Sequence, residues 1–74
     1  MIPAEALEFK VQADFEALQI PLKVLALKKD ILIAGIVRGR KNLIPSGEDV
    51  IQAGDRVIIL AAGRAVSTLS DILE

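Results

Sequence analysis

Residues 31–60, ILIAGIVRGRKNLIPSGEDVIQAGDRVIIL, decide the fold of this 74-residue chain. Two aliphatic runs, Ile31–Val37 and Val57–Ala62, have the length of strands and are bounded by turn residues, so they predict buried β-strands. Gly35 inside the first run indicates a bulge or a close approach of another backbone. Between the runs lie a basic turn and a segment that Pro45 restricts to the edge or the end of a sheet. The stretch therefore predicts strands joined by tight turns.

The flanking sequence adds one strand and two helices. Ala6–Gln12 alternates between apolar and polar residues, which is typical of a half-buried strand. Pro21 suits the first turn of a helix, so we expect a short helix over Pro21–Leu27. Ala65–Glu74 carries its apolar residues at helical spacing and predicts an amphipathic helix. The expected fold is a small α+β domain, residues 5–74, in the order β-α-β-β-β-α, with a mostly antiparallel sheet packed by a short helix and a C-terminal helix.

The composition points to association. Hydrophobic residues make up 53% of the chain, and there is no cysteine to form a disulfide. A chain this short buries a marginal core by itself, so we expect a homodimer or a higher homo-oligomer. Six apolar positions are expected at the contact, although each can equally belong to the core of one chain. They are Phe9, Val11, Ile33, Ile36, Val57 and Ile59.

The charge excludes some classes of protein. The net charge is −1, which gives no reason to expect nucleic-acid binding, although residues 23–41 form a local basic zone. The longest apolar runs are far shorter than the roughly 20 residues that span a bilayer, so no direct membrane insertion is expected. The N-terminus shows no secretory signal, and the expected location is the cytoplasm.

The residue types argue against catalysis. The chain contains no histidine, so none of its serines has the usual base to activate it, and we expect no enzyme activity. Glu48 and Asp49 lie in a loop that lacks the series of oxygen ligands of a calcium site, and no metal site is expected. Asp55 follows Ala-Gly in a turn and is expected to accept hydrogen bonds from nearby backbone amides.

The segments PLKVLAL, residues 31–62 and AVSTLSDIL, in this order, resemble the TrkA C-terminal domain, also called RCK-C. In that family an apolar strand ends near Arg-Gly, a segment close to Ile-Ile-Pro follows, and an Asp-x-Val-Leu-x-Ala-Gly-Asp element precedes the last strand. Here Arg38-Gly39, Leu43-Ile44-Pro45 and the residues 49–57 occupy those places. The resemblance covers about residues 5–73.

The resemblance implies a regulatory domain of potassium uptake systems, potassium channels or related ion transporters. Such a domain is cytoplasmic, lies at the inner membrane through a membrane-embedded transporter or channel partner, and acts by conformational change. It usually follows an RCK-N domain that binds NAD(H) or ATP. This chain has no Gly-x-Gly-x-x-Gly motif, so that nucleotide fold is absent from it and no cofactor is expected within it. The family's C-terminal domains dimerise, and some bind cyclic di-AMP or cations between two copies.

A ligand site is predicted at the basic turn. Arg38 and Asn42 supply a guanidinium and an amide, while Ile44 and Pro45 supply an apolar wall, a combination suited to a phosphate and a purine face. Two copies related by a twofold axis would match a symmetric dinucleotide such as cyclic di-AMP. The alternatives are a basic hairpin without a ligand and, from the similar Gly-Asp-Arg-Val-Ile strand, a swapped-strand transcription regulator.

Overall fold

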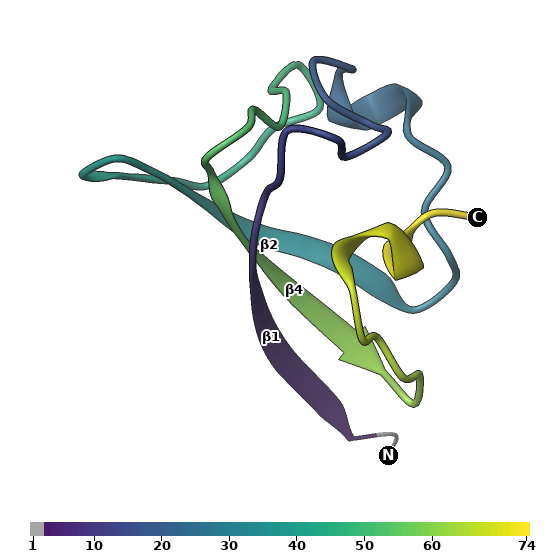
Figure 1. Ribbon diagram of the computed structural model, residues 1–74. Coiled ribbons are helices and arrows are strands. Elements are labelled where there is room, and N and C mark those ends of the chain that lie inside the picture. Colours follow the sequence, from purple (N-terminus) through teal and green to yellow (C-terminus); the bar gives the residue numbers. More distant parts are fainter. Residues whose placement is uncertain (1–2) are drawn as a thin grey trace.

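A computed structural model describes residues 3–74 and shows one antiparallel sheet with loops packed over one of its faces (Figure 1). The sheet has four strands in the order β1-β4-β2-β3. The two helical elements, η1 and η2, are single 3-10 turns. The elements are β1 (Ala4–Lys10), η1 (Leu22–Val24), β2 (Ile31–Arg38), β3 (Lys41–Leu43), β4 (Arg56–Ala62) and η2 (Leu69–Ile72).

Strand β4 organises the sheet because it pairs with β1 on one side and with β2 on the other. Its alternate residues Val57, Ile59 and Ala61 are buried, as expected where a strand turns one face to a core. The register with β2 shifts between Ile33 and Gly35, which confirms the predicted bulge. A Cβ at Gly35 would lie 3.4 Å from Ile58 Cδ1, in contact with the side chain of the residue that pairs with it on β4.

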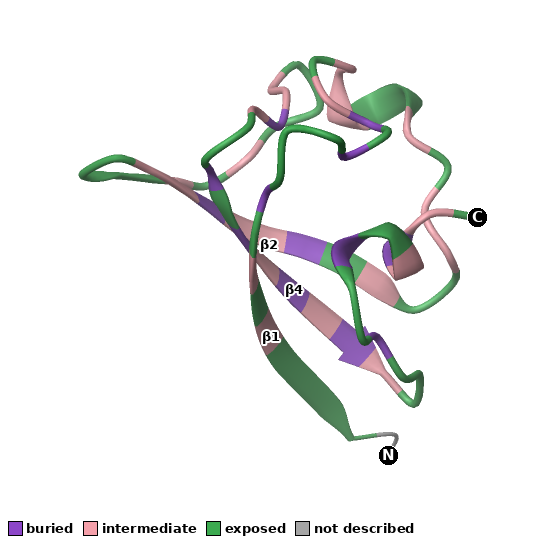
Figure 2. Ribbon diagram, in the orientation of Figure 1, coloured by how far each residue is buried: buried purple, intermediate pink, exposed green. Residues whose placement is uncertain are grey.

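The core lies between one sheet face and the loops. Every second residue of β4 is buried, β2 has two buried residues, one on either side of its bulge, and Figure 2 shows further buried positions in the loops above the sheet. Ile51 from the loop before β4 and Ile72 from η2 are fully buried, so the segments that lack regular structure still contribute to the core. On the other sheet face, Leu32, Ile58 and Leu60 remain partly or mostly exposed.

The predicted helices are the main difference from the expected α+β fold. The segments Pro21–Leu27 and Ala65–Glu74 each form one 3-10 turn and then extend. Leu27 and Leu73 form an antiparallel bridge, in which Lys28 N donates to Ile72 O (2.8 Å) and Glu74 N donates to Ala26 O (2.9 Å). The N–H groups of Lys28 and Glu74 are thereby bonded to the facing segment, so they are not available for hydrogen bonds within a longer helix. One 3-10 turn followed by an extended end is enough to bury the apolar residues whose spacing had predicted a helix.

The six apolar positions expected at a contact between copies form part of this chain's core. Ile36, Val57 and Ile59 have no exposed surface, Val11 is 2% exposed, and Ile33 is 8% exposed. Phe9 is half-buried and packs against the same cluster. A side chain without exposed surface does not touch a second chain, so Ile36, Val57 and Ile59 belong to the core of this chain. A contact at the half-buried Phe9 stays a prediction.

Candidate functional site

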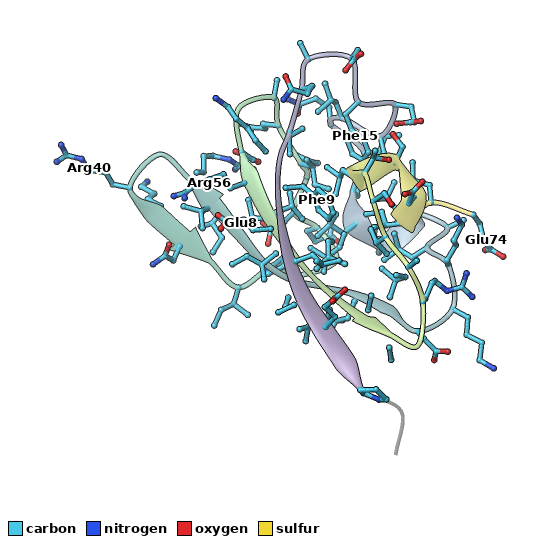
Figure 3. The ribbon with its side chains drawn as sticks, turned by 60° about the horizontal axis from the view of Figure 1, so that its bottom comes forward. Glu8, Phe9, Phe15, Arg40, Arg56 and Glu74 are labelled. Carbon is cyan, nitrogen blue, oxygen red and sulfur yellow. The ribbon has the colours of Figure 1, made fainter. Side chains whose placement is uncertain are left out.

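The hairpin of β2 and β3 projects from the body of the domain and carries the predicted ligand residues (Figure 1). Arg38 pairs with Lys41, which leaves Gly39 and Arg40 as a two-residue turn. Gly39 has a φ of 61°, which glycine adopts at little cost at the first position of a hairpin turn. Figure 3 shows the Arg40 side chain at the tip, pointing away from the protein. Within residues 3–74, neither Arg40 nor Lys41 takes part in an ion pair.

Arg38 is held at the base of the hairpin by Asp55. Its Nε donates to Asp55 Oδ1 at 2.9 Å, and its Nη2 donates to Asp55 Oδ2 and to the carbonyl oxygen of Val50, both at 2.8 Å. The side chain of Arg38 is 33% exposed, whereas that of Asp55 is only 2% exposed. A bidentate pair of this kind fixes both the distance and the orientation of the two elements that it joins.

The expected turn contact of Asp55 is confirmed, because its Oδ2 accepts a hydrogen bond from Gln52 N at 2.9 Å. Burial of the carboxyl disfavours its charged form and acts to raise its pKa. The hydrogen bonds from Arg38 and Gln52 and the guanidinium charge outweigh burial, so the pKa of Asp55 lies below its ordinary value. Asp55 is therefore ionised at neutral pH and joins β4 to the hairpin.

The loop after β3 is tied to η1. Lys23 N donates to Gly47 O (3.0 Å), Leu22 N donates to Asp49 O (2.9 Å), and the Lys23 ammonium pairs with Glu48. Asp49 also accepts a hydrogen bond from Ser46 N at 2.7 Å, which closes a local turn. These contacts give Glu48 and Asp49 structural roles in an exposed loop.

The structure separates the four predicted ligand residues into two groups. The Arg38 guanidinium already donates two hydrogen bonds to Asp55, so it stabilises the base of the hairpin. Asn42 is exposed, and Ile44 is 93% exposed, which is unusual for so large an apolar side chain. Pro45 is half-buried and lines a shallow cavity of about 190 Å³ beside the edge of β2.

Two further exposed apolar residues were not predicted from the sequence. Leu32 is 58% exposed and lines the same cavity as Pro45, and Val24 in η1 is 62% exposed. The aliphatic run Ile31–Val37 predicted a buried strand, and for Leu32 that prediction is wrong, because this residue lies on the open face of the sheet. Only the position of Leu32 on the open sheet face distinguishes it from its neighbours.

A larger cavity of about 580 Å³ lies between the end of β1 and η2. Phe9 and Phe15 form apolar walls, and Ser70 Oγ donates to Glu16 Oε1 at 2.6 Å, which lowers the pKa of Glu16.

Residues 3–74 contain no group of three or more His, Cys, Asp or Glu placed to hold a metal ion. No helix in this described range has the length and apolar character needed to cross a membrane.

Comparisons with known proteins agree with this geometry. The family model described as the TrkA-C domain matches residues 6–74. The chain is 40% identical over 72 residues to a Trk system potassium uptake protein TrkA homolog of Pyrococcus abyssi, and 38% identical over 72 residues to one of Pyrococcus horikoshii. Each match covers 96% of this chain and 32% of the relative, so the chain spans about a third of these proteins.

The fold also has a counterpart among solved structures. A chain described as "Structure of RCK domain with cda" superimposes with a TM-score of 0.71 at 26% sequence identity. The match covers 93% of this chain and 97% of the solved one. The four-stranded antiparallel sheet with few helical residues is thus an RCK-like fold, and the family model extends over nearly the whole sequence. The chain belongs to the TrkA-C domain family.

Proposed function

We propose that this chain is a regulatory domain of a potassium uptake or potassium channel protein and has no catalytic role. The observation that carries the proposal is the match of residues 6–74 to the TrkA-C domain together with the potassium uptake relatives. Because the chain spans about a third of those relatives, their activity is assigned here only as part of this proposal. The domain acts at the cytoplasmic side of the membrane, where it binds a membrane-embedded transporter or channel subunit.

The proposed mechanism is conformational. Two or more copies associate, and a change in their relative pose is transmitted to the transporter. In a longer protein, an RCK-N domain would supply the NAD(H) or ATP site that this chain lacks. The rigid connection between the hairpin and β4, made by Arg38 and Asp55, supports such transmission because a displaced hairpin moves with the central strand.

In-frame removal of the codons for residues 1–74 is expected to impair growth when potassium is limiting. The physical reason is that the transporter loses the domain that sets its activity. Growth yield across a series of external potassium concentrations measures the effect, and we expect the concentration for half-maximal growth to rise about 10-fold. Re-expression of the intact gene serves as the control. Unchanged growth at every potassium concentration would contradict the proposal.

A second candidate function is sensing of cyclic di-AMP at the hairpin. Ile44 exposes 93% of its surface beside the exposed Asn42, although an apolar side chain gains free energy from burial. The similar solved RCK domain is described with cda. In this hypothesis Ile44 and Pro45 contact a base, Asn42 donates a hydrogen bond, and Arg38 positions the strand from which they extend.

Replacement of Ile44 by alanine, or of Asn42 by alanine, is expected to weaken cyclic di-AMP binding about 10-fold, since each loses one contact with the ligand. Isothermal titration calorimetry measures the affinity. Val24→Ala is the matched control because Val24 is also exposed and aliphatic but lies on η1, and it should change the affinity less than about twofold. Absence of measurable binding by the parent chain would rule out this candidate function while leaving the regulatory proposal intact.

A further inference from the structure

The cavity between the end of β1 and η2 has an aromatic wall on the β1 side. Phe15 N donates to Gln12 O at 3.1 Å and closes the turn that follows β1. Figure 3 shows Phe9 and Phe15 on the side of β1 that faces η2. Phe15 is buried and Phe9 is half-buried, and both line the cavity. Two aromatic side chains therefore give this wall an apolar surface that is fixed in place by the fold.

The opposite wall is the start of η2, and its backbone is fixed as well. Asp71 Oδ2 accepts hydrogen bonds from Ser67 N (2.8 Å) and from Thr68 N (3.0 Å). The backbone donors of this wall are thus already used, and it presents hydroxyl groups such as that of Ser67 to the cavity. Walls that are held in position before a ligand arrives lower the cost of ordering them on binding.

Charged groups of both signs line the same cavity. Asp14 and Glu16 supply carboxylates, and Lys10 supplies an ammonium. In the part of the chain that the structure describes, none of these three takes part in an ion pair. The hydrogen bond from Ser70 Oγ lowers the pKa of Glu16, so its carboxylate is ionised at neutral pH. A carboxylate can accept several hydrogen bonds, so Glu16 retains capacity for a ligand.

The volume and the lining together define a class of ligand. The volume of about 580 Å³ lies within the range of roughly 300–1,000 Å³ that is typical of small-molecule sites. The ammonium of Lys10 suits a carboxylate, the two acidic residues suit an ammonium, and the two aromatic side chains suit an apolar group. A small molecule that carries all three features is an α-amino acid with a large apolar side chain.

Other classes of ligand match fewer of these groups. A nucleotide or a fatty acid brings negative charge without positive charge, and the two carboxylates of the cavity would repel it. A simple amine would bring its positive charge into a cavity that already holds Lys10, and it would leave that ammonium without a partner. A zwitterion satisfies both signs. Cyclic di-AMP is an anion, so this cavity is a different site from the one considered at the hairpin.

We propose that the cavity between β1 and η2 binds an α-amino acid with a large apolar side chain. The ammonium group of the ligand lies at Glu16, with Asp14 adding negative charge nearby, and its carboxylate lies at Lys10. Its side chain packs against the two phenylalanines. Such a ligand spans the two segments that the hydrogen bond between Glu16 and Ser70 already joins. The inference is additional to the proposed function and does not depend on it.

Titration of the isotopically labelled 74-residue chain with L-phenylalanine, followed by its amide NMR resonances, tests the proposal. We expect the resonances of Phe15 and Ser67, on opposite walls, to shift and to approach saturation below about 10 mM ligand. Two analogues each lack one charge: phenethylamine has no carboxylate, and 3-phenylpropionate has no ammonium. Each should bind about fivefold more weakly than phenylalanine, because each forms one exposed ion pair fewer.

Two variants assign the charges of the ligand to residues. Glu16→Gln removes the charge but keeps an oxygen for the Ser70 hydroxyl, and it should weaken phenylalanine binding about fivefold without weakening 3-phenylpropionate. Lys10→Gln should weaken phenylalanine binding about fivefold without weakening phenethylamine. Glu5→Gln makes the same change of charge on β1 at a residue that does not line the cavity, so this matched control should bind like the parent.

Three results would overturn the inference. The first is that phenylalanine shifts no resonance of the cavity at concentrations up to about 10 mM. The second is that phenethylamine or 3-phenylpropionate binds as tightly as phenylalanine, since the ligand would then not be a zwitterion. The third is that Glu16→Gln and Lys10→Gln bind phenylalanine as the parent does. Each of these results leaves the proposed role in potassium transport intact, because growth and uptake measurements test that role separately.

Discussion

Ile59→Ala is expected to lower the free energy of unfolding by about 3–4 kcal/mol, as for other large-to-small changes in a packed core. Ile59 has no exposed surface and lies in the central strand, with Leu7 opposite it on β1 and Ile33 opposite it on β2. Truncation leaves a cavity that neither neighbouring strand can fill without breaking its own pairing. Because a domain of this size has a stability of only about 4–10 kcal/mol, much of it would be lost.

Urea denaturation at two protein concentrations measures the effect of Ile59→Ala. Ile58→Ala is the control, since Ile58 is a half-buried neighbour on the other sheet face and should cost only about 1 kcal/mol. The loss at Ile59 should be the same at both concentrations if the residue is in the core of one chain. A variant that unfolds like the parent but no longer associates would show instead that Ile59 lies at a contact between copies.

Arg38→Ala is expected to destabilise the domain by about 2–3 kcal/mol. The change leaves the buried carboxylate of Asp55 without its bidentate partner, which is costly in a site removed from water. The partial exposure of Arg38 lets water replace some of the lost contact, so the loss falls below that of a fully buried pair. Arg38→Lys retains the charge without the fork and should cost about 1 kcal/mol. Thermal and urea unfolding at pH 7 compare the three proteins.

The pH dependence identifies the cause of that loss. The pKa of Asp55 is lower in the folded protein than in the unfolded chain, where it is about 3.9. Its stabilising contribution is fully present well above pH 4 and is lost as the pH falls through the folded pKa. The parent should therefore lose stability below about pH 4 more steeply than Arg38→Ala does. Parallel losses in acid would mean that Arg38 stabilises the domain by packing alone.

The strands were predictable because their local signals agree with their burial. The β-branched runs Ile31–Val37 and Val57–Ala62 form β2 and β4, and Gly35 lies at the bulge. The helices were not predictable to the same degree, because apolar spacing does not distinguish an amphipathic helix from one turn followed by an extended segment. The bridge between Leu27 and Leu73 is a tertiary contact, and it decides between the two.

The candidate site was predictable in position but not in detail. The sequence located the hairpin and its exposed Asn42 and Ile44, but it assigned Arg38 to a ligand. The structure pairs Arg38 with Asp55, which lies 17 residues away and is brought near only when the hairpin folds onto β4. For the same reason, composition indicated surplus apolar residues without distinguishing the core from a contact surface, since both require the same side chains.

We propose that the folded domain regulates potassium transport. The most direct test measures initial potassium uptake rates, at matched transporter abundance, in cells whose gene encodes the parent, Ile59→Ala or Ile58→Ala. We expect the potassium dependence of uptake to change only with Ile59→Ala, the variant that most destabilises this domain. Identical uptake curves for all three, with the domain shown to be unfolded in Ile59→Ala, would contradict it.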